Sequence, residues 1–176
     1  MQAQNIQTAR MLGPTQGRQG DLGSIGVRFM IDGAETDERF SLVEHPMPVG
    51  RLAAPLHRHN REDEYSFVLE GRMGALLGDE VVYAEAGDLV WKPRGQWHTF
   101  WNAGDAPARI LELISPAGFE DFFGELVDAG GVGAAGPDLL GELCARYALD
   151  MDPSSIPGLE ARFGVTLGPP QERPGL

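Results

Sequence analysis

Short segments that alternate apolar and polar residues, each followed by a turn signal, dominate the first two thirds of this chain. The clearest is 64–70, where Tyr65, Phe67 and Leu69 share one face because side chains alternate along a strand. Segments 72–77 and 80–84 flank Gly78-Asp79 and predict a hairpin. Further strands are expected at 24–31, 36–44, 50–59, 89–92, 98–102 and 109–114, with the proline-containing stretch 45–48 breaking the second of these. With about eight to ten short strands, the chain is predicted to form an all-β sandwich or barrel of the jelly-roll kind.

The hydrophobic period changes at Ser115, where helices are expected to begin. Ser115 followed by Pro116 has the form of a helix N-cap and first turn, and apolar residues recur at helical spacing to about Asp128. A second helix is expected at 139–149 and a short third one at 153–163. The chain is therefore divided into an N-terminal arm at 1–23, a barrel at 24–114, a C-terminal helical extension at 115–165 and a flexible tail at 166–176.

Charge and composition narrow the partners and the compartment. The formal net charge is −12, which repels phosphate backbones and argues against nucleic acid. No apolar run is long enough for a membrane span, and the polar residues 1–15 do not form a secretory signal. The single cysteine, Cys144, is consistent with a reducing compartment, so a cytoplasmic protein is expected. Lys92 is the only lysine, which leaves one position for Schiff-base chemistry.

Three histidines and a glutamate form the strongest chemical signal. His57 and His59 are two positions apart on an expected strand and point to the same side. Glu64 has the opposite parity and must reach them from a neighbouring strand, while His98 follows the turn Pro93-Arg94-Gly95. Three imidazoles and a carboxylate suit one divalent transition metal, with Fe, Mn, Ni, Zn and Cu all acceptable. The alternatives are a site that has lost its metal, or Glu62 or Asp63 replacing Glu64.

The spacing of these residues resembles the two motifs of the cupin superfamily, in particular its small single-domain, quercetin dioxygenase-like members. The first motif is represented by Gly50, His57, His59, Glu64 and Gly71, with one extra residue after Gly50. The second motif, G-x5-P-x-G-x2-H-x3-N, is matched by Gly87, Pro93, Gly95, His98 and Asn102. The resemblance covers 50–102 directly. It implies a double-stranded β-helix barrel, with His57, His59, Glu64 and His98 as metal ligands.

The resemblance favours the first of three functions and leaves the other two open as alternatives. The first is a metal-dependent oxygenase of the dioxygenase type that acts on a small organic substrate. The second is a metal-dependent isomerase, decarboxylase or lyase, which needs an additional acid or base; Glu44, Glu70 and Tyr83 are the candidates. The third is a non-catalytic cupin that binds a small molecule. The resemblance also implies a homodimer formed through exchanged N-terminal strands or through sheet faces.

Overall fold

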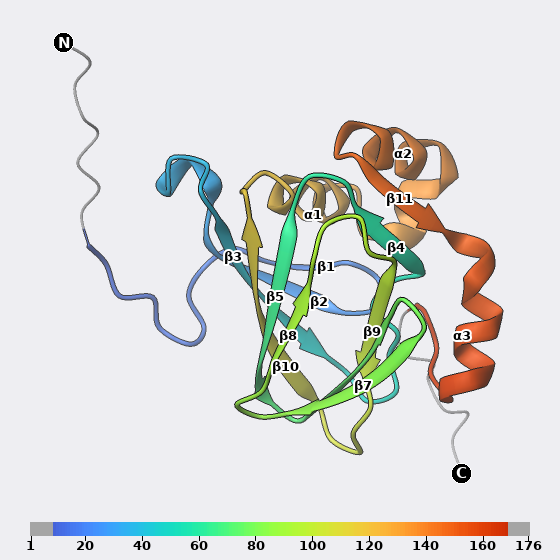
Figure 1. The fold of residues 1–176 in the computed structure, drawn as a ribbon. Helices are drawn as coiled ribbons and strands as arrows, with labels where there is room; N and C mark the ends of the chain where they lie inside the picture. Colours follow the sequence, from blue (N-terminus) through green and yellow to red (C-terminus); the bar gives the residue numbers. More distant parts are fainter. Residues whose placement is uncertain (1–8, 169–176) are drawn as a thin grey trace.

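Two antiparallel sheets pack face to face in the computed structural model, which describes residues 9–168. The six-stranded sheet has the order β1-β2-β3-β10-β5-β8 and the five-stranded sheet the order β11-β4-β9-β6-β7 (Figure 1). The strands are β1 (Gln19–Asp21), β2 (Gly26–Ile31), β3 (Ser41–Met47), β4 (Leu56–His59), β5 (Asp63–Glu70), β6 (Arg72–Leu77), β7 (Glu80–Glu85), β8 (Leu89–Lys92), β9 (His98–Asn102), β10 (Ala108–Ser115) and β11 (Leu149–Asp152). The predicted jelly-roll barrel with a helical extension is confirmed.

Alternation along the strands builds the core between the sheets. In β10 every second residue is buried, which points Ile110, Glu112 and Ile114 inward. Val68 of β5 and Met73 of β6 are also fully buried. Glu112 is thus a carboxylate inside an otherwise apolar row, and such a residue requires a polar partner.

Tight turns bring the two motif regions together. Gly71 has φ 76°, and a Cβ atom there would lie 2.8 Å from the Cα of Ala108, so a side chain cannot be accommodated without movement. Gly95 has φ 78°, and its backbone N–H donates to the carbonyl oxygen of His59 at 2.7 Å. The turn before His98 is therefore hydrogen-bonded to the strand that carries the other two histidines.

One strand continues where the sequence predicted a break. β3 runs through Pro46 to Met47 and pairs with β10 along its whole length. The pairing of β3 with β2 involves residues 42–44 only. Pro46 lies beyond that paired stretch, so its missing N–H removes no hydrogen bond on the β2 side.

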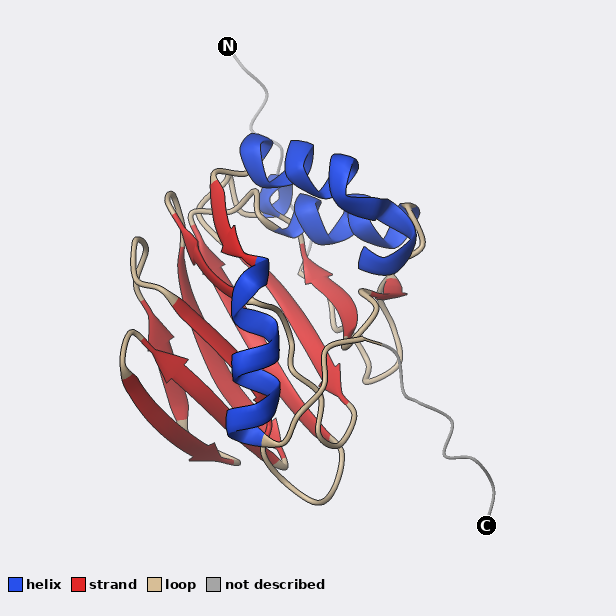
Figure 2. Cartoon of the chain, turned by 90° about the vertical axis from the view of Figure 1, so that its right-hand side faces the viewer, coloured by secondary structure: helices blue, strands red, loops and turns tan. Residues whose placement is uncertain are grey.

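The helices cover one end and one side of the barrel. The α-helices are α1 (Glu120–Asp128), α2 (Val132–Arg146) and α3 (Ile156–Phe163), and short 3-10 turns occupy η1 (Gly33–Glu35) and η2 (Pro153–Ser155). Figure 2 shows α1 and α2 together at one end, with α3 lying alongside the sheets. Phe163 of α3 stacks on Trp101 of β9 with ring centroids 4.0 Å apart. No helix among residues 9–168 has the length and apolar character to cross a bilayer.

Several helix boundaries differ from those predicted. Ser115 is the last residue of β10, where it pairs with Asp63, and α1 begins only at Glu120. α2 begins at Val132 and is kinked at Gly136, which has φ 72°. The predicted second helix was expected to end at Leu149, but α2 ends at Arg146 and Leu149 is the first residue of β11, which pairs with β4. The free edge of β4 accounts for this difference, because pairing there outweighs the helical propensity of the segment.

Candidate metal centre

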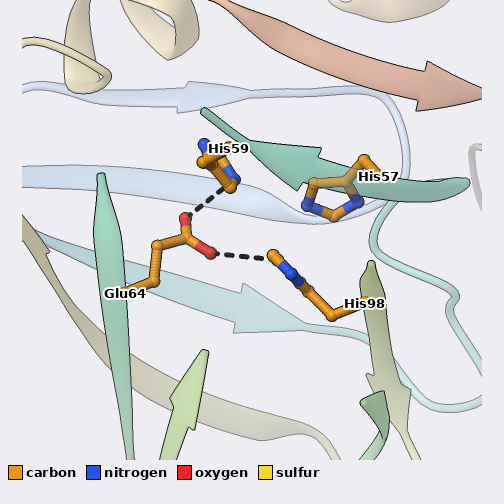
Figure 3. Close-up of side chains that lie close together, drawn as sticks. All are labelled: His57, His59, Glu64 and His98. Atoms are coloured by element: carbon orange, nitrogen blue, oxygen red, sulfur yellow. Dashed lines mark ion pairs between the residues drawn. The ribbon is translucent and has the colours of Figure 1, made fainter. Parts of the chain in front are cut away.

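The four predicted ligands lie together between the two sheets. His57 and His59 come from β4, His98 from β9 and Glu64 from β5. One ligand atom from each lies within 4.8 Å of the others, and all four residues are buried (Figure 3). Glu64 lies on a different strand from the paired histidines, as its parity predicted, but that strand belongs to the opposite sheet and is not a neighbour of β4.

Backbone carbonyl groups orient two of the imidazoles. The Nδ1 atom of His57 lies 2.8 Å from the carbonyl oxygen of Pro55, and Nδ1 of His98 lies 3.0 Å from that of Gln96. Carbonyl oxygens only accept, so each Nδ1 carries the proton and each Nε2 presents a lone pair. His57 and His98 are direct neighbours in the β4–β9 register, which brings these two rings to the same point.

The polar atoms at the centre fit a cation. His59 Nε2 and His98 Nε2 are buried and have no hydrogen-bond partner. Glu64 Oε1 lies 3.4 Å from His59 Nε2, and Glu64 Oε2 lies 3.2 Å from His98 Nε2. Burial lowers the pKa of His57 well below its usual value and that of His59 to about 4. Neutral imidazoles are the form that binds metal.

The carboxylate of the set is ionised. Burial alone would raise the pKa of Glu64, but the ammonium group of Lys92 opposes it, and the pKa lies well below the usual range. Three imidazole nitrogen donors and one anionic oxygen donor form a set that Fe, Mn, Ni, Zn or Cu accepts. The metal identity is not determined by this donor set.

A buried lysine and a second buried glutamate extend the site, and sequence reasoning missed both roles. Lys92 faces Glu64 across β5 and β8, and its Nζ lies 3.0 Å from Glu64 Oε2 and 3.1 Å from Glu112 Oε2. Burial would lower the pKa of Lys92, but Glu112 and Glu64 raise it above its usual value. The amine is therefore protonated, which argues against Schiff-base formation.

Glu112 has one oxygen fixed and the other free. Its Oε2 accepts a hydrogen bond from Ser66 Oγ at 2.8 Å, besides the contact with Lys92. Its Oε1 is buried without a hydrogen-bond partner, and the residue lines the central cavity. Burial, opposed by Lys92 and reinforced by Glu64, raises the pKa of Glu112 to about 7. Its position between Ile110 and Ile114 in an inward-facing row was the sequence signal that could have identified it.

The central cavity has a volume of about 60 Å³ and mostly apolar walls. The start of helix α1 closes it: Phe119, the N-cap residue, lies edge-on to His59 at 4.2 Å, and Phe123 of the helix lies edge-on to His45 at 5.1 Å between ring centroids. The aromatic face of α1 both packs on the barrel and lines the cavity. His45 is buried, its Nδ1–H donates to the carbonyl oxygen of Gly26, and burial lowers its pKa to about 4.

The remaining acidic candidates occupy other environments. Glu62, named from the sequence as an alternative to Glu64, is buried, with Oε2 3.8 Å from His59 Nδ1, and burial raises its pKa to about 7. Asp63 pairs with Arg94 at 2.8 Å at the surface.

None of the three acid–base candidates named from the sequence lines the central cavity. Glu44 is buried in ion pairs with Arg28 and Arg109. Glu70 is largely exposed and Tyr83 is 52% exposed.

Comparison with known proteins gives the same assignment for the barrel. Residues 44–114 match the family described as Cupin domain. Over 60 residues the chain is 35% identical to the tetracenomycin polyketide synthase protein TcmJ of Streptomyces glaucescens, covering 34% of this chain and 40% of that protein. It is also 35% identical over 71 residues to the uncharacterized protein MJ1618 of Methanocaldococcus jannaschii, covering 40% and 56%. These alignments span about half or less of each relative.

Solved structures share the fold. The structure of KdgF from Halomonas sp. superposes with a TM-score of 0.57 at 17% identity, covering 65% of this chain and 99% of that one. The polyketide cyclase RemF from Streptomyces resistomycificus superposes with a TM-score of 0.53 at 26% identity, covering 61% and 80%.

Proposed function

The barrel belongs to the cupin superfamily, and from this premise we propose that the chain is a metal-dependent enzyme that moves a proton of a small enolisable organic anion. This is the isomerase, decarboxylase or lyase class of reaction. The observation that carries the proposal is the free Oε1 of Glu112 in the cavity that is also lined by His57, His59 and Glu64. The sequence-based hypothesis required such an additional acid or base, and Glu112 meets that requirement.

The residues have separate roles in this proposal. His57, His59, Glu64 and His98 would hold a divalent ion, which would supply positive charge for an anionic substrate oxygen. Glu112 accepts a proton from substrate carbon on Oε1 and returns it. A pKa of about 7 suits that task, because a general acid–base works best near the ambient pH. Lys92 and Ser66 hold Oε2 in place, which fixes the direction of Oε1.

The similarity to polyketide proteins supports a substrate with enolisable carbonyl groups. Polyketide chains carry carbonyl groups at alternate carbons, whose intervening protons are acidic. TcmJ and RemF are described as a polyketide synthase protein and a polyketide cyclase. The apolar walls of the cavity exclude water and strengthen electrostatic interactions with a bound enolate.

A dioxygenase-type oxygenase is the second candidate. Four protein ligands leave two positions free on a six-coordinate ion, enough for a substrate oxygen and dioxygen. This function uses the same metal site but assigns no proton-transfer role to Glu112. The two candidates therefore differ in their dependence on oxygen and on that carboxylate.

One set of assays separates the candidates. Elemental analysis of the purified protein, with His57→Ala as the control, identifies the metal. The metal-loaded protein is then mixed with 2,4-pentanedione in D2O without oxygen, and loss of the central C–H signal is followed by NMR. We expect exchange faster than in buffer and in the metal-free protein, and loss of that acceleration in Glu112→Gln. Oxygen uptake with phenolic or diketone substrates that persists in Glu112→Gln would instead establish the oxygenase. If the protein shows neither proton exchange nor oxygen uptake, the non-catalytic binding protein is the remaining alternative.

A further inference from the structure

A second cavity adjoins the metal site beneath the helical extension. It has a volume of about 170 Å³, against about 60 Å³ for the cavity at the metal cluster. Its walls come from α1, α2, β11, η2 and α3 and from the segments before β2 and β4. These elements of the helical extension lie at one end and one side of the barrel (Figure 2), and most of them follow the region that matches the Cupin domain.

The two cavities share part of their walls. Leu22, Ala53, Ala54, Phe122, Phe123 and Met151 line both. Phe122 is buried and Phe123 half-buried on the inner face of α1. A ligand that reaches past these shared side chains would occupy both spaces at once.

The chemistry of the second cavity is apolar. Ser24 is its one polar lining side chain among the described residues, and Ser24 Oγ already donates to the carbonyl oxygen of Leu52 at 2.6 Å. A cavity without polar partners does not retain ordered water. An apolar cavity of about 150 Å³ is large enough to accept benzene. The volume therefore corresponds to one aromatic ring.

We propose that this second cavity binds an aromatic ring of the substrate while the oxygen-bearing end of the same molecule lies at the metal cluster. The ligand class is a small arylalkyl carboxylate or aryl-substituted enolate. This inference rests on the proposed function for the position of the anionic end, but the ring site itself requires neither metal nor catalysis.

Ligand binding to the Co²⁺-loaded protein tests the proposal. Propanoate, phenylacetate, 3-phenylpropanoate and 4-phenylbutanoate are titrated while the visible Co²⁺ bands report contact with the ion. We expect one phenyl compound to bind about thirtyfold more tightly than propanoate, because burying an aromatic ring contributes on that scale. Leu140→Phe, which places a ring in the cavity from α2, should reduce that affinity ratio to near one.

A second variant guards against simple misfolding. Leu140→Ala enlarges the cavity and should shift the preference from phenyl to naphthyl carboxylates, a gain that damage to the fold does not produce. Benzene binding by the metal-free protein, measured from NMR shifts of the Leu140 and Met151 methyl groups, tests the ring site alone. Ring binding without diketone exchange would overturn the proposed function and keep this inference. Equal affinities for propanoate and all phenyl compounds, with no benzene binding, would overturn the inference.

Discussion

The pH dependence of the free energy of unfolding should reveal whether the carboxyl group of Glu112 titrates near neutral pH. Its pKa is about 7 in the folded protein, against an ordinary value of 4.5. The folded state therefore binds more protons than the unfolded state between these values. The stabilisation of the folded state by protonated Glu112 is fully present below pH 4.5 and is lost as the pH rises through 7.

The expected magnitude follows from that difference. One pKa unit corresponds to about 1.4 kcal/mol, so between pH 5 and pH 8 the free energy of unfolding of the metal-free protein should fall by about 2–3 kcal/mol through this group alone. Glu112→Gln keeps the shape and accepts from Ser66 but cannot ionise. At high pH it also removes one of two buried carboxylates that share the single Lys92 ammonium group. The variant should therefore match the wild type near pH 5 and exceed its stability by about 2–3 kcal/mol at pH 8.

Denaturant unfolding in the presence of a chelator, monitored by tryptophan fluorescence at four pH values, measures this difference. Glu80→Gln removes one charge from the exposed start of β7 and is the matched control. The relevant quantity is the difference between variant and wild type, because other buried groups such as Glu62 titrate in both. A constant difference across the range would show that Glu112 is already ionised at pH 5 and would refute its assignment as a group poised near neutrality.

Further predictions concern the metal site, the core and the assembly. His98→Ala should lower metal affinity at least about a hundredfold, because it removes one of the four candidate ligands; calorimetry with Zn²⁺ or Mn²⁺ measures the affinity, and an unchanged value would remove His98 from the ligand set. Gly74→Ala should destabilise the fold by about 1–3 kcal/mol in denaturant unfolding, because the new Cβ would lie 2.3 Å from the Trp101 ring; wild-type stability would mean that the ring moves freely. The homodimer stays a prediction, and Trp91, which is 56% exposed on the edge strand β8, is a candidate contact residue. Light scattering should show that the wild-type protein is a dimer and that Trp91→Glu weakens the dimer. A monomeric wild-type protein would contradict the prediction.

Most of the strands and the four candidate ligands were predictable because their signals are local, whereas β1 and β11 were missed and β3 and β4 begin later than the predicted strands at 36–44 and 50–59. Alternation places Glu64 on its own strand, and the spacing of His57 and His59 fixes their common side. The turn at Gly95 positions His98 through a hydrogen bond to the backbone of His59, and its glycine is visible in the sequence. In each case a short segment of chain contains the whole physical cause.

The features that were missed depend on contacts between distant segments. β11 forms because the edge of β4 is available, and nothing within 149–152 specifies that edge. Glu62 is buried because the chain folds back near His59, although its own neighbours in sequence are charged. Glu112 and Lys92 meet only because β5 lies between β10 and β8 in the sheet. A strand order of this kind cannot be obtained from hydrophobic period alone.

The buried charges explain why the only lysine lies at this position. Glu64 and Glu112 are both fully enclosed, and two carboxylates in a medium of low polarity would not both ionise without a nearby cation. Lys92 contacts both and so keeps Glu64 anionic while leaving Glu112 close to its titration point. A divalent ion in the cluster adds positive charge and favours ionised Glu112, the form that accepts a proton. An arriving organic anion cancels part of that charge and favours protonation of Glu112. Binding of an anionic substrate and the pKa of Glu112 are therefore coupled by electrostatics alone.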